Sequence, residues 1–320
     1  MIKRIGILTS GGDAPGMNAA IRSIARIANS KGIEAYGIYD GYKGLINGDI
    51  KKLTREDVSN TVDRGGTFLG TARLPEFKNP TVMNEGIEQL QRLGIDALIV
   101  IGGDGSFRGA SALSQAGINC IGIPATIDND LSYTDYTIGF DTALNTVVEA
   151  IDKLRDTSSS HHRCSVVEVM GNRCGDLALW AGIATGAEVV VTNQTGFEES
   201  EILDKLKIMD TSKGKDHAIV IISEKLTDVH AFAKKVSQYT NFSGRATVLG
   251  HIQRGGSPTP QDRVLASRMG EKAVELLMNG IGGHCVGIKD NKIFSMPIDE
   301  ALNVPRSSRR KLHELFDELV

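Results

Sequence analysis

The segment Pro124–Asp130 concentrates the side chains best suited to chemistry. Its last five positions, from Thr126 to Asp130, hold a hydroxyl, two carboxylates and an amide. It follows the apolar run Cys120–Ile123, which predicts a buried strand, and ligands of open α/β sheets bind beyond the carboxyl ends of strands. Two acids this close repel unless a cation balances them, so the segment predicts a site for magnesium, arginine or both. The alternative is a solvated acidic turn that caps a helix beginning near Thr142.

Glycine-rich turns follow two further apolar strands. Ile5–Leu8 runs into a turn at 9–16, and Ala97–Ile101 runs into Gly102–Ser106. Glycines let the backbone approach a ligand, and the N–H groups at a helix start favour an anion such as phosphate. The acid in the second turn, Asp104, is suited to Mg²⁺. The sequence contains neither a Walker A motif nor G-x-G-x-x-G, which disfavours a P-loop kinase and a nicotinamide oxidoreductase.

Arginines and histidines accompany other glycines. The loop Arg64–Arg73 has an arginine at each end and three glycines, as a loop near phosphate would, although a lone arginine is commonly a surface charge. His251 and Arg254 are candidates for a sugar or phosphate contact, and a core histidine is the alternative for His251. His161 and His162 invite a metal interpretation, but adjacent residues leaving a helix rarely chelate together.

The expected elements predict an α/β protein. Buried strands at 97–101, 166–170 and 218–222 alternate with helices such as 142–158, whose apolar positions recur at 3.6-residue spacing. At 320 residues the chain exceeds a typical single core. We therefore expect one large or two medium α/β domains.

Composition excludes several classes of function. The net charge of −3 leaves no general basic face, so we expect no nucleic-acid partner. No apolar run approaches 18 residues and no signal-peptide pattern is present, so we expect a soluble cytoplasmic protein with no membrane partner. Four cysteines lack C-x-x-C spacing and are expected as free thiols, with Cys120 and Cys285 in the core.

Four segments together resemble the bacterial ATP-dependent 6-phosphofructokinase family, namely Gly11–Gly16, Gly102–Ser106, Thr126–Asp130 and Gly250–Gly256. They occur in the family's order at expected strand ends, and the likeness covers nearly the whole chain. The resemblance implies Mg²⁺-assisted transfer of a phosphoryl group from ATP to the 1-hydroxyl of fructose 6-phosphate. The products would be fructose 1,6-bisphosphate and ADP, a step of glycolysis. It also implies a homotetramer. Each subunit would have two similar domains, each a mostly parallel sheet flanked by helices in a Rossmann-like three-layer sandwich.

By this resemblance the larger domain, at 1–139 plus 253–304, binds ATP and magnesium. Its expected ATP residues are Gly12, Tyr42, Arg73, Phe77, Gly103, Asp104, Gly105, Ser106 and Gly109, with Asp104 on Mg²⁺. Asp128 would be the base that accepts the proton of the sugar hydroxyl. Thr126 and Asp130 would orient the hydroxyl and the metal shell. Arg73 would stabilise charge on the transferring phosphoryl group.

The smaller domain, at 140–252 plus 305–320, is expected to bind fructose 6-phosphate. The expected substrate residues are Thr126, Asp128, Asp130, Met170, Gly171, Asn172, Arg173, Glu224, His251 and Arg254, with Arg163 and Arg245 from a neighbouring subunit. Arginine suits the 6-phosphate because guanidinium pairs bidentately with phosphate oxygens. An effector site for ADP, GDP or phosphoenolpyruvate is expected between subunits, at Arg22, Arg26, Arg55, Arg155, Glu188, Lys213 and Lys215.

The chain departs from the family pattern at several positions. Asn172 stands where the family has arginine, Ala125 replaces a glycine, Asp216 replaces a lysine, and 191–194 lacks the family's Pro-Glu. These changes motivate one alternative, a catalytically weakened regulatory or ligand-binding member of the family. The other alternative is the pyrophosphate-dependent relative, which usually carries Asp for Gly105 and Lys for Ala125. Small residues at both positions favour ATP.

Overall fold

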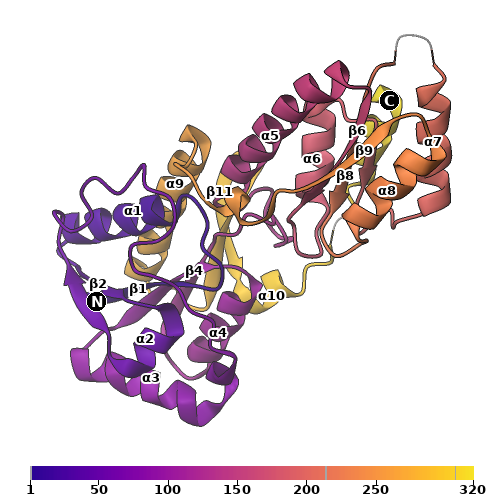
Figure 1. The fold of residues 1–320 in the computed structure, drawn as a ribbon. Coiled ribbons are helices and arrows are strands. Elements are labelled where there is room, and N and C mark those ends of the chain that lie inside the picture. The colour runs from indigo at the N-terminus through magenta and orange to yellow at the C-terminus, as the bar shows by residue number, and fades with distance from the viewer. Residues whose placement is uncertain (1, 213–214, 307) are drawn as a thin grey trace. The chain divides into compact units, whose positions relative to one another are not determined.

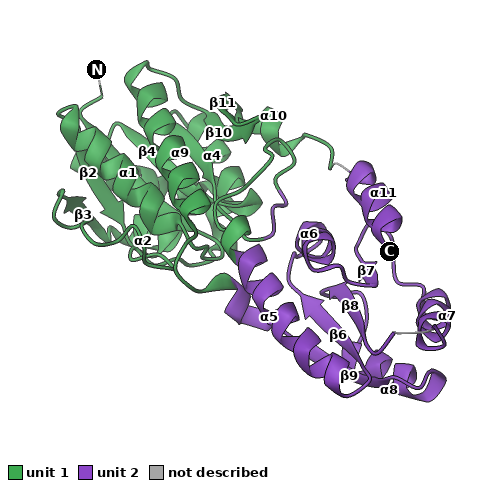
Figure 2. Ribbon diagram, turned by 90° about the horizontal axis from the view of Figure 1, so that it is seen from above, with its two compact units in different colours: residues 1–127, 131–142, 254–306 green, residues 128–130, 143–253, 307–320 purple. Residues whose placement is uncertain are grey.

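The computed structural model describes residues 2–212, 215–306 and 308–320, and the chain divides into two compact units (Figure 2). Unit 1 comprises Met1–Ile127, Leu131–Thr142 and Arg254–Arg306, and unit 2 comprises Asp128–Asp130, Ala143–Gln253 and Ser307–Val320. The acidic segment Asp128–Asp130 belongs to unit 2, although the residues on both sides of it, up to Ile127 and from Leu131, belong to unit 1.

Unit 1 is built on a seven-stranded sheet in the order β11-β10-β5-β4-β1-β2-β3. The strands are β1 (Arg4–Ser10), β2 (Glu34–Ile38), β3 (Ile50–Leu53), β4 (Ala97–Gly102), β5 (Asn119–Pro124), β10 (His284–Lys289) and β11 (Lys292–Pro297). Only the edge strands β3 and β11 pair antiparallel with their neighbours. Every residue of the central strand β4 is buried, as expected for a parallel strand covered on both faces.

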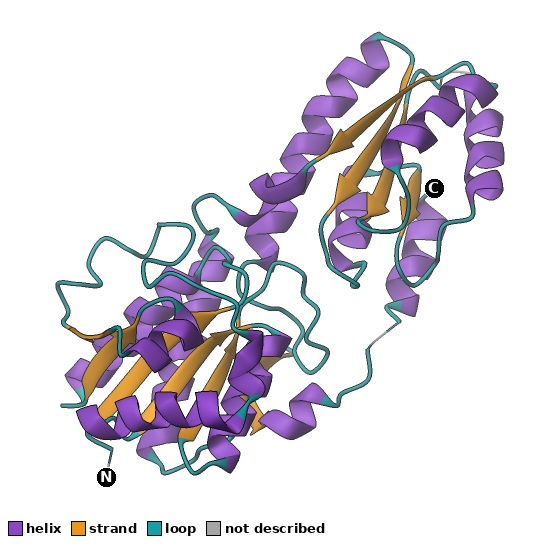
Figure 3. Cartoon of the chain, turned by 60° about the horizontal axis from the view of Figure 1, so that its bottom comes forward, coloured by secondary structure: helices purple, strands orange, loops and turns teal. Residues whose placement is uncertain are grey.

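Helices cover both faces of this sheet (Figures 1 and 3). They are α1 (Met17–Ser30), α2 (Gly41–Asn47), η1 (Pro75–Lys78), α3 (Pro80–Leu93), α4 (Asp104–Gln115), α9 (Pro260–Met278) and α10 (Ile298–Leu302). Helices α1 and α9 pack together on one face. On the other face α2, α3 and α4 form a core with alternate β4 residues Leu98 and Val100.

Unit 2 has a four-stranded, all-parallel sheet in the order β7-β8-β6-β9. Its strands are β6 (Arg163–Val169), β7 (Val189–Val191), β8 (Ala218–Ser223) and β9 (Ser243–Val248). Its helices are α5 (Phe140–Ser160, which begins in unit 1), α6 (Asp176–Thr185), α7 (Glu199–Asp210), α8 (Val229–Tyr239) and α11 (Arg310–Leu319). Helices α7 and α8 share a core with one face of the sheet, and α11 packs on α6. The short 3₁₀ helix η2 covers Gly250–Arg254.

The predicted fold class is confirmed, because both units are sheets of mostly parallel strands flanked by helices. The sequence patterns did not indicate α2 and β3, which are short. All four cysteines are free and buried, and burial raises the pKa of Cys120 and Cys285 to about 12. In the described part of the chain, no helix is both long enough and apolar enough to cross a membrane.

Candidate functional site

Three neighbouring strands of unit 1 end at the same level. Ser10 of β1 is paired with Gly102 of β4, and Gly102 is paired with Pro124 of β5. The residues that follow these strands therefore share one edge of the sheet. A Cβ added to Gly103 would lie 3.9 Å from Cβ of Thr126, which shows how closely two of the turns approach. The glycine turns after β1 and β4 and the start of the segment after β5 therefore lie at one edge of the unit 1 sheet.

The loop between Arg64 and Arg73 is fixed over the first glycine turn by threonine hydroxyls. Thr9 Oγ1 donates to the carbonyl oxygen of Gly70 at 2.7 Å, and Thr71 Oγ1 donates to that of Gly11 at 2.9 Å. Such side-chain hydrogen bonds hold in place a loop whose backbone is not part of a sheet. Arg73 itself is exposed at the end of this loop, as expected for a residue available to a ligand.

Asn18 anchors the start of the same loop. Its amide nitrogen donates to the carbonyl oxygens of Arg64 and Gly65 at 3.0 and 3.2 Å, and its Oδ1 accepts from the Phe68 amide at 2.8 Å. The side chain is 2% exposed. Asn18 stands where a P-loop would need Ser or Thr, so its burial gives a structural reason for the departure from that motif.

Arg254 lies against the β1–α1 turn. A Cβ on Gly12 would come within 2.7 Å of Nη1 of Arg254, so only glycine leaves this space to the guanidinium. The same nitrogen lies 3.9 Å from Oδ1 of Asp13. A cation beside a glycine turn at a helix start is suited to an anionic ligand such as phosphate. The guanidinium of Arg254 therefore lies beside the glycine turn between β1 and α1.

Asp104, the expected magnesium ligand, is the first residue of α4 and is paired with Arg108 one turn on. Nε and Nη2 of Arg108 lie 2.9 and 3.1 Å from the two carboxylate oxygens of Asp104. No group of three or more His, Cys, Asp or Glu residues suited to a metal occurs in the described ranges. One carboxylate still fits Mg²⁺, because this ion is commonly held by one or two carboxylates plus waters and substrate phosphates. Arg108 would have to release Asp104.

The expected ATP residues of α2, η1 and α4 meet in the core of unit 1. The Tyr42 hydroxyl donates to the carbonyl oxygen of Ser106 at 2.6 Å, and the Tyr42 ring stacks on Phe77 at a centroid distance of 4.2 Å. A Cβ on Gly109 would lie 2.6 Å from the Tyr42 ring. These residues are packed together and leave little room for a ligand among themselves. At Gly105, in contrast, an added Cβ would meet no atom within 4 Å.

The helix near Thr142 is capped by Asp262, whose Oδ1 accepts from the Gly139 amide and whose Oδ2 accepts from the Thr142 amide, both at 2.9 Å. Asp262 is 1% exposed, and burial raises its pKa to about 6. Ala125, the other departure beside this segment, is 1% exposed, so its methyl group is enclosed by protein.

In unit 2, the candidate substrate residues gather where β6 and β8 end. The amide of Asn172 donates to Oε1 of Glu224 at 2.7 Å, and the Nζ of Lys225 donates to Oδ1 of Asn172 at 3.0 Å. Asn172 and Lys225 both have left-handed backbones, with φ of 57° and 69°, a conformation that is uncommon for lysine. The amide of Met170 donates to Oε1 of Gln253 at 3.1 Å. Positive charge thus lies beside Asn172.

Acids also gather at these strand ends. The pKa of Glu168 is raised by burial and, secondarily, by the nearby charge of Glu224. Arg173 is exposed in the β6–α6 turn, and Gly171 has φ of 141°, which favours glycine there. His251 is exposed, so the core-histidine alternative is wrong.

Arg163 lies at the other end of the unit 2 strands. It is the first residue of β6, whereas Glu224 follows β8, whose last residue is paired with Val169 at the end of β6. Six residues of strand separate the two levels, about 20 Å. Arg245, on β9, is paired with Ser165 and is likewise set back from the strand ends. Within one chain, Arg163 is therefore at the opposite end of the strands from Glu224.

The adjacent histidines do not form a metal site. Nε2 of His162 lies 3.0 Å from Oδ1 of Asp210, and its ring stacks on Phe242. Nδ1 of His161 is 3.1 Å from the carbonyl oxygen of Thr157. The two rings thus have separate structural partners.

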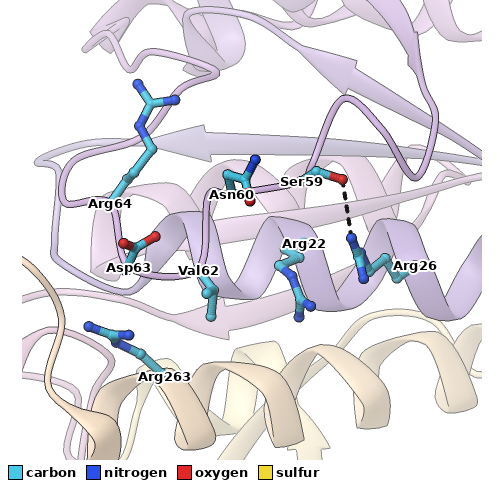
Figure 4. A pocket seen from close by; sticks show the side chains of 8 residues that line it. All are labelled: Arg22, Arg26, Ser59, Asn60, Val62, Asp63, Arg64 and Arg263. Atoms are coloured by element: carbon cyan, nitrogen blue, oxygen red, sulfur yellow. Dashed lines mark hydrogen bonds between the residues drawn. The ribbon is translucent and has the colours of Figure 1, made fainter.

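Two of the expected effector residues line a pocket in unit 1 of about 560 Å³ (Figure 4). Arg22 and Arg26 of α1 share it with Arg64 and with Arg263 of α9. Nη2 of Arg26 donates to Oγ of Ser59 at 3.2 Å. Burial and the neighbouring charges of Arg26 and Arg55 lower the pKa of Arg22. Four guanidinium groups make the pocket suited to an anion; Arg55 is exposed and is not among the lining residues.

The other effector residues lie in unit 2. Oε2 of Glu188 accepts from the Ile219 amide at 2.6 Å, and its Oε1 pairs with Lys215. Arg155 donates to the carbonyl oxygen of Thr185 and contacts Nε2 of His217 at 3.2 Å. Lys213 lies outside the described residues. Glu188 and Lys215 thus pair with each other. Glu188 and Arg155 each contact a residue in or next to the start of β8, namely Ile219 and His217.

Sequence reasoning missed several residues of these sites, namely Asn18, Arg108 and Lys225. Arg108 has a readable signal, because an arginine four residues after an aspartate on a helix predicts an ion pair. The other contacts join segments far apart in the chain, which single-sequence patterns do not reveal.

The chain is similar to known proteins both in sequence and in structure. A family model described as Phosphofructokinase matches residues 4–277. An ATP-dependent 6-phosphofructokinase of Photobacterium profundum is 57% identical over the whole of both chains. One from Bacillus cytotoxicus is 54% identical over 99% of each chain. A solved phosphofructokinase from Saccharomyces cerevisiae has 35% identity and a TM-score of 0.87, covering 99% of this chain and 48% of that one.

Proposed function

Because this chain belongs to the phosphofructokinase family, we propose that it transfers the γ-phosphoryl group of ATP to the 1-hydroxyl of fructose 6-phosphate. The products are fructose 1,6-bisphosphate and ADP, and the reaction is a step of glycolysis. One structural observation supports the proposal in addition to the similarity to known proteins. The ends of β1, β4 and β5 are in register, which brings two glycine turns and the segment leading into the catalytic acids to one edge of a sheet.

Unit 1 is the ATP-binding unit in this proposal. The turns after β1 and β4 offer backbone N–H groups at helix starts, and Arg254 adds a cation beside Gly12. Arg73 is exposed and would stabilise the charge of the transferring group. Asp104 would hold Mg²⁺, which neutralises phosphate charge when bound.

Asp128 is the base in this proposal. Its carboxylate takes the proton of the 1-hydroxyl while the hydroxyl oxygen bonds to the γ-phosphorus. The bond from that phosphorus to the oxygen bridging the β-phosphate breaks, and the electron pair leaves with ADP. Thr126 and Asp130 would orient the hydroxyl and the metal shell. Positioning of this kind supplies most of the acceleration in phosphoryl transfer.

The space around Gly105 favours ATP over pyrophosphate as the donor. An added Cβ there would meet nothing within 4 Å, so the small residue leaves room beside Asp104. The pyrophosphate-dependent pattern would fill this space with an aspartate. The methyl group of Ala125 is buried and does not occupy it.

Unit 2 is the sugar-phosphate unit in this proposal, with Met170, Glu224 and the residues beside them at the strand ends. Arg163 lies at the opposite end of the strands, so a contact to the same ligand would come from Arg163 of another subunit. This supports a homotetramer with shared sites. At Asn172, where the family pattern has arginine, Lys225 supplies a cation 3.0 Å away, which argues against a weakened regulatory protein.

The arginine pocket of unit 1 supports an anionic effector, either a nucleotide such as ADP or GDP or phosphoenolpyruvate. Its partners on unit 2, Arg155, Glu188 and Lys215, would belong to a neighbouring subunit. A cytoplasmic location stays a prediction of the sequence.

The function is tested with the purified protein, Mg²⁺, ATP and fructose 6-phosphate, following the product by ³¹P NMR. We expect a new phosphomonoester on carbon 1 and one ADP for each sugar phosphorylated. Hydrolysis of ATP without a sugar product, or phosphorylation at another hydroxyl, would contradict the proposal.

A further inference from the structure

Asn129 stands between the two candidate catalytic acids, Asp128 and Asp130, and is 4% exposed. Its backbone is left-handed, with φ of 50°, which asparagine tolerates better than most residues. Its side-chain nitrogen donates to Oδ2 of Asp176 at 2.9 Å, and its carbonyl oxygen contacts Sγ of Cys174 at 3.7 Å. The turn between β6 and α6 therefore holds Asn129 by both its side chain and its backbone.

Asp176 is in turn held by the C-terminal segment. It is the first residue of α6, and only 1% of it is exposed. Nη2 and Nε of Arg309 lie 2.8 and 3.2 Å from its two carboxylate oxygens. A bidentate pair fixes both groups more tightly than a single bond does. Arg309 also has a left-handed backbone, at φ of 50°, immediately before α11.

From this chain of contacts we propose that Arg309 is a positioning residue for phosphoryl transfer. Arg309 pairs with Asp176, and Asp176 accepts a hydrogen bond from the Asn129 side chain. The position of Asn129 in turn determines where the neighbouring carboxylates of Asp128 and Asp130 lie. The contacts lie within unit 2, which accounts for the membership of 128–130 in that unit. This inference rests on the proposed function of Asp128. Misplacing a catalytic group by about 1 Å costs up to about a hundredfold in rate, so the effect should fall on kcat.

Adjacent arginines provide a matched experiment. Arg310 is also in an ion pair, with Nε 2.7 Å from Oε1 of Glu314, but its side chain is 84% exposed and this partner lies one turn along the same helix. We expect Arg309→Gln to lower kcat by about 10- to 100-fold, with KM for both substrates within about threefold. Arg309→Lys should restore part of the loss. Arg310→Gln should behave as the wild type in both kinetics and urea unfolding.

A second variant separates positioning from folding. Asn129→Gly keeps the left-handed backbone and the Asp176–Arg309 pair, and removes the amide that donates to Asp176. It should lower kcat to a similar extent while urea titration shows that the variant is folded under the assay conditions. Wild-type kcat in a folded Arg309→Gln, or in Asn129→Gly if Arg309→Gln does not fold, would overturn the role of Arg309. A wild-type protein that does not phosphorylate fructose 6-phosphate would instead overturn the proposed function.

Discussion

Gly105 allows the nucleotide site to be tested by one substitution that acts with opposite signs on folding and on binding. It lies in the first turn of α4, where an added Cβ would meet no atom within 4 Å. Aspartate in a first helical turn interacts favourably with the helix dipole, and replacing glycine reduces the entropy of the unfolded chain. We expect Gly105→Asp to raise the free energy of unfolding by about 0.5–1.5 kcal/mol.

ATP binding should change in the other direction. The new carboxylate would occupy the open space beside Asp104, where we propose that phosphates bind. Two like charges 4 Å apart repel by about 1 kcal/mol in bulk water and about 4 kcal/mol at an effective dielectric constant of 20. The expected rise in KM for ATP is therefore between about fivefold and about a thousandfold.

The assay compares initial rates over a range of ATP at saturating fructose 6-phosphate, alongside urea unfolding of the ligand-free protein. Gly105→Asn is the matched control, because it has nearly the same size without the charge, and its KM for ATP should rise less. If Gly105→Asp is folded and its KM for ATP stays within twofold of the wild type, the turn after β4 does not bind nucleotide phosphates.

Three further predictions concern other parts of the molecule. Asp128→Ser should lower kcat at least a hundredfold with little change in KM or unfolding, and near-normal turnover would exclude Asp128 as the base. Lys225→Met should raise KM for fructose 6-phosphate about 10- to 150-fold, since a charge-assisted contact contributes about 1.5–3 kcal/mol; Lys207→Met, at an exposed position of α7, is the control. Burial raises the pKa of Asp262 from 3.8 to about 6, so its protonation stabilises the fold fully below pH 3.8, and this contribution is lost as the pH rises through 6. The unfolding free energy of the wild type minus that of Asp262→Asn should thus grow by about 2 kcal/mol from pH 7 to 4, and a pH-independent difference in urea titrations would contradict it.

The strands and the glycine turns could be predicted from the sequence because their signals are local. Ala97–Ile101 is a continuous apolar run closed by glycines, and the structure places β4 there with one more residue. β3 has no such apolar run, because its four residues include two exposed lysines at a sheet edge. α2 was missed because its seven residues begin with a glycine and contain another. Short elements with few apolar positions give too little periodicity to be recognised.

The connections within the site could not be predicted, because each joins residues far apart in the chain. Asp262 caps the start of α5 from 120 residues away. Arg254 reaches Gly12, and Arg309 reaches Asp176 over 133 residues. Propensity and spacing carry no information about such contacts. The acids Asp128 and Asp130 were predicted as catalytic candidates from the sequence, but the contacts that hold Asn129 between them were not.

The central claim is that this protein phosphorylates fructose 6-phosphate from ATP. The most direct measurement supplies the purified protein and Mg²⁺ with fructose 6-phosphate and either ATP or pyrophosphate, side by side, and follows fructose 1,6-bisphosphate. We predict turnover with ATP and none above background with pyrophosphate. Turnover with pyrophosphate alone, or none with either donor from a folded protein that still binds both ligands, would contradict the claim.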